Sequence, residues 1–139
     1  AVLAALVTGG LTAGLSAIAL AILFGLDNAM IAAIAPKSVT APVAMGIAKN
    51  LGGPVSLAAL LAVLTGITGA VIATPLFNAF GFSDLRGRGF AVGVTCHGIG
   101  TAHAFQISPV AGSFATIGMA LNALFSALIL PVLYLVLLG

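Results

Sequence analysis

Long uninterrupted apolar stretches alternate along this chain with short segments rich in polar residues, glycine or proline. Three of the stretches, at residues 2–24, 54–80 and 112–138, contain no charged side chain. Each is longer than the roughly 20 residues that an α-helix needs to cross a hydrocarbon core about 30 Å thick. The pattern therefore predicts three membrane-spanning helices.

Two further apolar segments are interrupted near their middle. In residues 29–51, Pro36 and Pro42 flank a short polar stretch, and each proline removes a backbone donor and disfavours helix in the residue before it. This predicts two short helices separated by a break at residues 36–40, with Thr40 as the N-cap of the second. In the segment that ends at Ile107, the interrupting residues and the candidate cap of a second half-helix are Gly98, Gly100 and Thr101.

The two broken segments repeat one order of unusual features after about 60 residues, a longer period than that of solenoid repeats. Transporters often carry repeats with discontinuous helices in corresponding positions. If each broken segment returns to the side it entered, the second unit is inverted; if each crosses fully, the units are parallel. The density of proline and glycine in mid-segment favours hairpins. We therefore expect one all-α integral membrane domain over residues 1–139, with three spanning helices and two broken, re-entrant segments in an inverted repeat (leading helix 2–24, repeats about 29–80 and 86–138).

The amino-acid composition excludes several classes of protein. The chain is 62% apolar and 4% charged, whereas a soluble domain has roughly 25% charged residues. This excludes a soluble globular domain, a disordered segment and a nucleic-acid binder with a broad basic face. Half of the six charges lie in a polar loop predicted at residues 81–89, where Arg86 and Arg88 favour the cytoplasmic side. Because there is no initiator Met and no basic segment before the first apolar run, we expect further natural sequence on the N-terminal side.

Two smaller features have structural interpretations. Gly10 and Gly14 form a GxxxG pair, which can allow close approach of helices, but with 18 glycines in the chain a chance occurrence is preferred. Asn122, in the last apolar stretch, is interpreted as a packing contact between helices and not as a ligand.

The two breaks predict a binding site. Non-helical backbone at membrane depth is tolerated only against protein or a water-filled cavity, so two breaks predict a shared polar cavity. Each break leads into a helix N-terminus, which offers unpaired N–H groups and roughly half a positive charge, and two such ends would form an anion site. Lys37 adds a full charge, and hydroxyls come from Ser38, Thr40 and Thr101. An uncompensated lysine at the centre of a membrane helix costs about 2.5–3.5 kcal/mol, which a mobile anion or water would offset; the alternative is that Lys37 extends to the membrane interface.

The two histidines allow two interpretations each. One is substrate contact or proton relay, since histidine titrates near neutral pH; the other is a neutral imidazole satisfied by backbone carbonyls. For His97, beside the glycines, the functional interpretation is preferred, and for His103 the two stay open. The candidate substrate-binding set is Lys37, Ser38, Thr40, His97, Gly98, Gly100, Thr101 and His103, with Pro36 and Pro42 as structural residues at the breaks. No His/Cys spacing typical of a metal site occurs, and no cofactor is expected.

At this point the motifs can be compared with known families. The runs PKSVTAPVAMGIA (residues 36–48) and RGFAVGVTCHGIGTA (residues 88–102) resemble the LrgB/CidB family of bacterial membrane proteins, and the resemblance covers essentially the whole chain. Ala41 stands where Thr is usual, Gly46 where many members have Glu, and His103 where Arg or Lys is common. These departures leave the substrate preference and any ion coupling open.

The resemblance implies two functions. The family is named for antiholin-like control of murein hydrolases and autolysis, while chloroplast relatives are glycolate/glycerate transporters and bacterial relatives paired with LrgA-type proteins are linked to pyruvate transport. We therefore expect a carrier for small monocarboxylates or, alternatively, a regulatory subunit with a holin-like partner, in a multi-pass bacterial cytoplasmic membrane protein. Implied partners are a small carboxylate, the lipid bilayer, an LrgA/CidA-like small membrane protein and further copies of the chain, with no nucleic acid. An enzyme using Cys96 is disfavoured, because no carboxylate near it could orient a base.

Overall fold

A computed structural model describes residues 2–138, which form six α-helices and no strand. The helices are α1 (Val2–Leu23), α2 (Asn28–Ile34), α3 (Ala41–Asn50), α4 (Val55–Ala79), α5 (Leu85–Ile107) and α6 (Pro109–Leu138). Three of them, α1, α4 and α6, have 22, 25 and 30 residues and are long and apolar enough to cross a membrane. At about 1.5 Å per residue even the shortest extends about 33 Å. The predicted spanning helices are thus confirmed, although α6 begins at Pro109 and not near Gly112.

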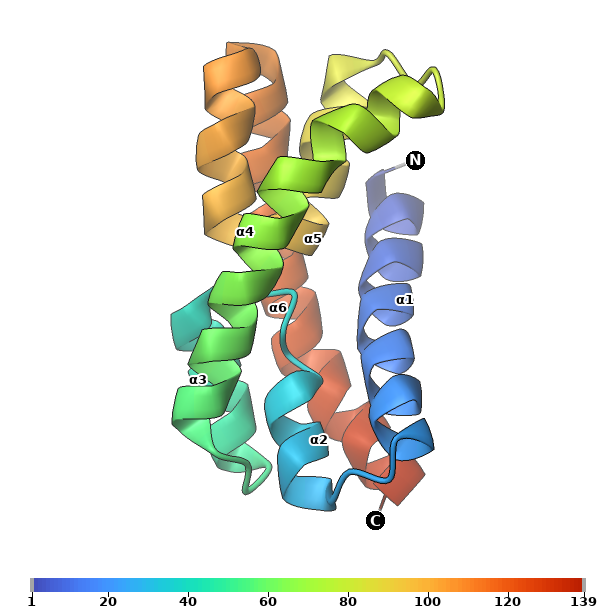
Figure 1. Cartoon of the computed structure of the whole chain (residues 1–139), viewed down its shortest axis with the longest axis vertical. Coiled ribbons are helices and arrows are strands. Elements are labelled where there is room, and N and C mark those ends of the chain that lie inside the picture. The colour runs from blue at the N-terminus through green and yellow to red at the C-terminus, as the bar shows by residue number, and fades with distance from the viewer. Residues whose placement is uncertain (1, 139) are drawn as a thin grey trace.

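The first broken segment is a hairpin of two short helices. α2 runs from one end of the molecule toward its middle, and α3 returns to the same end (Figure 1). After α3, Gly53 contacts α2 so closely that a Cβ on it would lie 2.8 Å from Cβ of Ala32. With 7 and 10 residues, α2 and α3 extend about 10 and 15 Å, which is about a third and a half of a hydrocarbon core about 30 Å thick. The first tip (residues 35–40) contains the break predicted from the prolines, with Thr40 at the N-cap position of α3 and Pro42 in its first turn.

α5 is a second hairpin, because its backbone changes direction at His97 (φ 43°, ψ −131°). The arm at residues 85–96 runs to the middle of the molecule, and the arm at residues 98–107 returns (Figure 1). The prediction that Gly98 and Gly100 make the break is wrong by one to three positions. The missing Cβ of Gly100 serves the contact between the arms instead, since a Cβ there would lie 2.5 Å from Cβ of Cys96. The second tip is defined here as residues 95–98.

The two hairpins enter from opposite ends of the molecule, and their tips meet near its middle (Figure 1). In chain order α4 follows the first hairpin and α6 follows the second, and these two long helices run in opposite directions (Figure 1). The first arm of α5 packs against α6 without side chains between them at Gly118, where a Cβ would lie 2.5 Å from the Phe90 carbonyl oxygen. Glycine is needed for this close approach of two helix backbones.

α5 begins at Leu85, within the segment predicted to be a loop at residues 81–89. The Asp84 carboxylate caps the helix by accepting from the backbone N–H groups of Arg86 and Gly87, at 3.2 and 3.3 Å. Acidic residues are favoured at this end of a helix, because they satisfy unpaired N–H groups and complement its dipole. The loop prediction is therefore wrong for residues 85–89, because the polar residues there start a helix.

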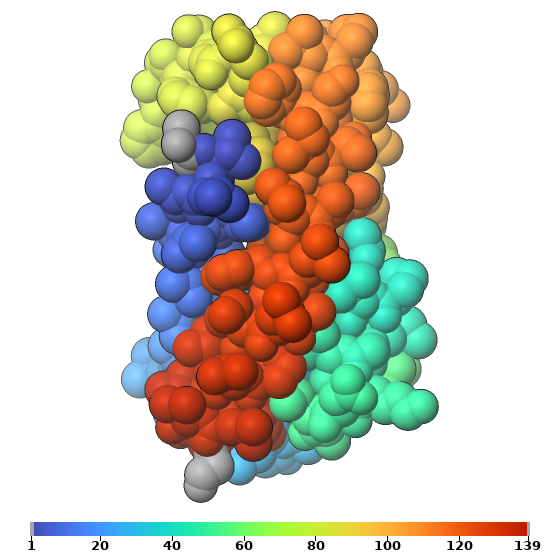
Figure 2. All heavy atoms as spheres, turned by 180° about the vertical axis from the view of Figure 1, so that it is seen from behind, coloured from blue at the N-terminus to red at the C-terminus, as the bar shows by residue number. Residues whose placement is uncertain are grey.

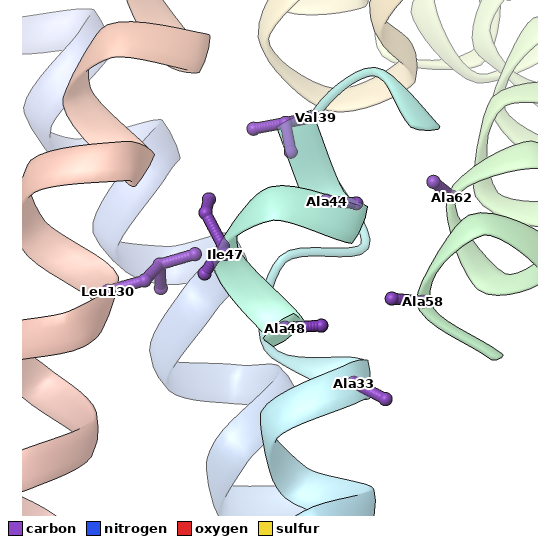
Figure 3. Packing of buried hydrophobic residues seen from close by; sticks show 8 residues of the cluster. All are labelled: Ala33, Val39, Ala44, Ile47, Ala48, Ala58, Ala62 and Leu130. Atoms are coloured by element: carbon purple, nitrogen blue, oxygen red, sulfur yellow. The ribbon is translucent and has the colours of Figure 1, made fainter. Parts of the chain in front are cut away.

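The core beside the first tip is built mainly of alanine. Ala44 and Ala48 of α3 face Ala58 and Ala62 of α4, all fully buried. Figure 3 shows this hairpin between α4 and α6; among the residues drawn, Ile47 meets Leu130 on the α6 side, whereas the alanines of α3 point toward α4. Small side chains let α3 pack closely against α4, and this close packing holds the first tip near the middle of the molecule. The cluster comprises Ala33, Val39, Ala44, Ile47, Ala48, Ala58, Ala62 and Leu130.

Gly10 and Gly14 lie in the contact between α1 and α6. A Cβ on Gly10 would lie 2.8 Å from the Phe125 ring, and one on Gly14 would lie 2.7 Å from Cδ2 of Leu130. The interpretation of this GxxxG pair as a chance occurrence is therefore wrong. From behind, α6 occupies the middle of the molecule with α1 on one side and α3 on the other (Figure 2). The outer surface carries large apolar side chains such as Phe80, 80% exposed, as a lipid-facing surface requires.

Candidate functional site

Asn122 of α6 joins the two tips in the middle of the molecule. Its Nδ2 donates hydrogen bonds to the carbonyl oxygen of Ser38 in the first tip, at 2.9 Å, and to that of Val94 beside the second, at 2.8 Å. Its Oδ1 accepts from the Ser126 hydroxyl at 3.4 Å. Only 2% of Asn122 is exposed. The breaks are therefore brought together inside the fold, by a side chain that does act as a contact between helices.

The polar groups of the second tip mostly bond to the backbone. His97 is buried, and its Nε2 lies 2.8 Å from the carbonyl oxygen of Ala62 in α4. Because a carbonyl only accepts, Nε2 is the nitrogen that donates. The hydroxyl of Thr101, also buried, donates to the His97 carbonyl oxygen at 2.7 Å. The bond to Ala62 holds the second tip against α4, and the Thr101 bond ties the tip to its own returning arm. The structure thus gives the His97 imidazole a structural role.

A groove of about 820 Å³ lies between α1, α4 and the first arm of α5. Its wall is largely apolar, and both hairpins contribute to it. The first tip supplies Lys37 and Ser38, and the second supplies Thr95 and Cys96. The long helices add a set of hydroxyls, which belong to Thr8, Thr12, Thr65 and Thr68.

Lys37 is the only charged side chain on the groove wall. Its Nζ lies 3.4 Å from Oγ of Ser38. Between residues 2 and 138 the single ion pair joins Arg86 to Asp84, at 3.9 Å, and Asp27 accepts from the backbone N–H of Met30 at the start of α2. Both carboxylates of the chain thus cap helices, and Lys37 has no acidic partner in the part that the structure describes.

The remaining candidates lie away from the groove wall. Thr40 occupies an N-cap position, but its side chain makes no capping hydrogen bond. Gly98 is exposed, while Gly100 is buried between the two arms of α5. His103 lines a separate pocket of about 20 Å³ together with Arg88. The groove therefore combines Lys37 and Ser38 with hydroxyls of the long helices, and the two helix N-termini do not form its wall.

The threonines of the long helices were not among the site residues predicted from the sequence. Thr8 and Thr12 are four residues apart in α1, and Thr65 and Thr68 are three apart in α4. Both spacings place side chains on one face of a helix. Two such pairs in uncharged helices indicate a polar stripe on each helix. Inside a bilayer the hydroxyls of such a stripe need hydrogen-bond partners.

The structure defines a multi-helix membrane protein with an internal polar region. It has three helices of membrane-spanning length, two shorter hairpins whose tips meet, and a groove whose wall carries one lysine. The chain belongs to the LrgB-like family, whose family model matches residues 1–136. The resemblance found in the two sequence runs is thus confirmed.

Curated relatives agree with this assignment. The chain is 34% identical over 113 residues to a protein of Staphylococcus epidermidis named holin-like protein CidB, covering 81% of this chain and 49% of that protein. It is 32% identical over 112 residues to holin-like protein CidB of Staphylococcus aureus, with the same coverage of 81% and 49%. An uncharacterized protein of Haemophilus influenzae is 30% identical over 133 residues, which are 96% of this chain and 58% of that protein.

The chain spans about half the length of the curated relatives it matches. No solved structure matches it. Together with the three spanning helices, the bacterial relatives define a bacterial membrane protein.

Proposed function

We propose that this chain forms the core of a membrane carrier for small monocarboxylates, of the size of pyruvate, glycolate or glycerate, and that the Lys37 groove holds the anion. The observation that carries the proposal is the position of Lys37 as the one charged side chain on a largely apolar wall, with Ser38 Oγ at 3.4 Å and no acidic partner within residues 2–138. A buried charge requires a counter-charge or a polar shell. A bound carboxylate would supply the counter-charge, and neighbouring hydroxyls would donate to its oxygens.

The arrangement of the hairpins supports a carrier in a second way. In this proposal, the first hairpin with α4 and the second hairpin with α6 correspond to the two repeats expected near residues 29–80 and 86–138. Entry of the hairpins from opposite ends of the molecule supports a relation by inversion (Figure 1). Inverted repeats with broken helices at mid-membrane are typical of secondary transporters, in which the site opens alternately to the two sides. The tips that enter from opposite ends would then serve as the inner and outer boundaries of one site (Figure 1).

A second candidate function is a regulatory subunit that controls murein hydrolases through a holin-like partner. The names of the staphylococcal relatives, holin-like protein CidB, favour it and support it more directly than they support a carrier. It requires no anion in the groove. It requires a surface for an LrgA/CidA-like protein, and the exposed apolar residues of the long helices would offer one within the cytoplasmic membrane, also to further copies of this chain.

The two functions separate in one experiment. The protein, expressed from its complete coding sequence, is purified with and without an LrgA-like partner, reconstituted in liposomes and supplied with labelled pyruvate or glycolate. The carrier predicts saturable uptake above that of empty liposomes, which Lys37→Met reduces at least tenfold. Lysis is measured in parallel in cells carrying the same variants.

Each outcome assigns the function. Absence of uptake in both preparations would exclude the carrier. Lysis that depends on the protein but not on Lys37 would then support the regulatory subunit. If Lys37→Met abolishes uptake and the effect on lysis together, regulation follows from metabolite flux.

A further inference from the structure

Asn122 donates to one backbone carbonyl at each of the two breaks. The carbonyl of Ser38 lies in the first tip, and the residue four positions later is Pro42, which has no N–H. The carbonyl of Val94 lies in the last turn before His97, where the backbone of α5 changes direction. A carboxamide has two N–H groups, and Asn122 donates to both carbonyls.

Both carbonyls belong to segments that form the groove wall. Ser38 follows Lys37, and both lie on the wall; Val94 directly precedes Thr95 and Cys96, which also lie on it. Asn122 itself is not part of that wall. Its two hydrogen bonds therefore join the first tip to the end of the first arm of α5 from outside the groove: one goes to Ser38 and one to Val94.

We infer that Asn122 is a positioning residue of the groove: its carboxamide fixes the spacing between Lys37 on the first tip and Thr95 on the second. No other side chain within residues 2–138 makes hydrogen bonds to both of these segments. The inference rests on the proposed function only where it ascribes anion binding to this spacing.

The neighbouring Ser126 provides a matched control. Its hydroxyl donates to Oδ1 of Asn122 at 3.4 Å, long for an O–H···O hydrogen bond, and makes no bond to either tip. Ser126→Ala therefore removes a buried polar contact of the same side chain and leaves both tip bonds in place. Asn122→Asp has the opposite effect, because a carboxyl group keeps the shape of the side chain but has no N–H and, even when protonated, can donate only one hydrogen bond, so it cannot join both carbonyls.

The test is thiol cross-linking across the groove in the protein expressed from its complete coding sequence, in native membranes. Because Cys96 is buried, Lys37→Cys is combined with Thr95→Cys, an exposed position of the second tip on the groove wall, in the Cys96→Ala background. The protein is treated with short and long bifunctional thiol reagents, and Lys37→Cys with Cys96→Ala alone shows the background. We expect cross-linking when Asn122 is present, at least a fivefold loss with Asn122→Asp, and less than a twofold change with Ser126→Ala. Unchanged cross-linking in Asn122→Asp, or none with Asn122 present, would overturn the inference.

A second variant covers a failure to fold. If Asn122→Asp no longer elutes as a monodisperse species in detergent, Asn122→Gln replaces it, because this variant keeps the carboxamide but places it one methylene farther from α6. The expected result is a shift of preferred cross-linking toward a different reagent length, and the same preference as with Asn122 would overturn the inference.

In liposomes, Asn122→Gln is expected to raise KM for uptake at least fivefold with a maximal rate within twofold. If the protein shows no uptake at all, the proposed function fails, while cross-linking still decides the role of Asn122.

Discussion

The imidazole Nε2 of His97 lies 2.8 Å from the carbonyl oxygen of Ala62, so the second tip is fastened to the middle of α4. The contact depends on Gly66, one turn further along α4, because a Cβ there would lie 2.7 Å from Cε1 of the imidazole. His97 also has a φ of 43°, the one positive value at a non-glycine residue between positions 2 and 138. The residue that makes the break therefore also anchors it.

Substitution of His97 tests whether conformation or hydrogen bonding dominates. Residues held in such a backbone conformation carry about 1–3 kcal/mol of strain, and a buried hydrogen bond contributes about 1 kcal/mol. In His97→Gly the relief of strain stabilises the fold while the loss of the hydrogen bond destabilises it, so we expect the free energy of unfolding to change by no more than about 1 kcal/mol. In His97→Val the strain increases and the bond is lost, so the midpoint of thermal unfolding in detergent should fall clearly further. Equal midpoints for the two variants would show that the backbone at this position is not strained.

Gly69 and Cys96 should be energetically coupled. A Cβ on Gly69 would overlap Sγ of Cys96, while Cβ of Cys96 would lie 3.2 Å away. We expect Gly69→Ala to destabilise the fold by about 1–3 kcal/mol, as overpacking does. The double variant with Cys96→Ala should recover most of that loss.

The matched control for this cycle is Gly46→Ala, because no atom lies within 4 Å of a Cβ built at this helical glycine. Alanine in a helix is favoured over glycine by about 0.8–1 kcal/mol, so this variant should be neutral or stabilising. Thermal unfolding of the four proteins of the cycle gives the coupling energy. Strictly additive effects of Gly69→Ala and Cys96→Ala would contradict the contact.

Arg86 and Arg88, at the start of α5, should differ in their contribution to stability. Arg88 donates to Asn78 Oδ1 at 2.7 Å and to the Phe82 carbonyl oxygen, and its guanidinium lies 5.5 Å from the centroid of the Phe77 ring. Lysine cannot reproduce this forked geometry, so Arg88→Lys should cost about 1 kcal/mol.

Arg86 is the control for Arg88. Its side chain is 69% exposed, and its ion pair with Asp84 is 3.9 Å long. Exposed ion pairs contribute little to stability. Chemical denaturation of both variants should therefore show a loss for Arg88→Lys and no measurable change for Arg86→Ala, and the reverse order would contradict the contacts described for Arg88.

Anion charge should determine selectivity under the carrier hypothesis. Lys37 is the one charged group on the groove wall, so it can neutralise one carboxylate. The second carboxylate of a succinate-like dianion would remain without a counter-charge among apolar side chains, which is costly. We expect a dicarboxylate to compete with pyruvate uptake at least tenfold more weakly than glycolate does, which corresponds to about 1.4 kcal/mol. Equal competition would indicate a further cation in the site.

Much of the fold could be predicted from the sequence, because a bilayer leaves few options for uncharged apolar stretches and for the breaks between them. Pro36 and Pro42 located the first tip because proline acts on the local backbone. The second tip was misplaced, because its break depends on His97 and on a contact with α4, which is remote in sequence. Gly100 was expected to interrupt the helix, but its missing side chain serves the contact between the two arms of α5.

The candidate site was predictable only in part. Lys37 and Ser38 lie on the groove wall, as a polar break at mid-depth suggests. The roles of Thr101 and Asn122 depend on which carbonyls each side chain meets, and no local pattern encodes that. The helix N-termini were expected to face the cavity, but the direction in which a tip turns is set by packing.

The central claim, that a small monocarboxylate occupies the Lys37 groove, is tested most directly by protection of a thiol placed there. Thr68→Cys lies on the groove wall, whereas Ser113→Cys is exposed on α6 away from it, and both are made with Cys96→Ala. Pyruvate or glycolate should slow maleimide labelling at position 68 at least fivefold and saturably, should leave position 113 unchanged, and should lose its effect when Lys37→Met is added. Labelling at position 68 that no monocarboxylate slows, or protection that persists without Lys37, would contradict the account.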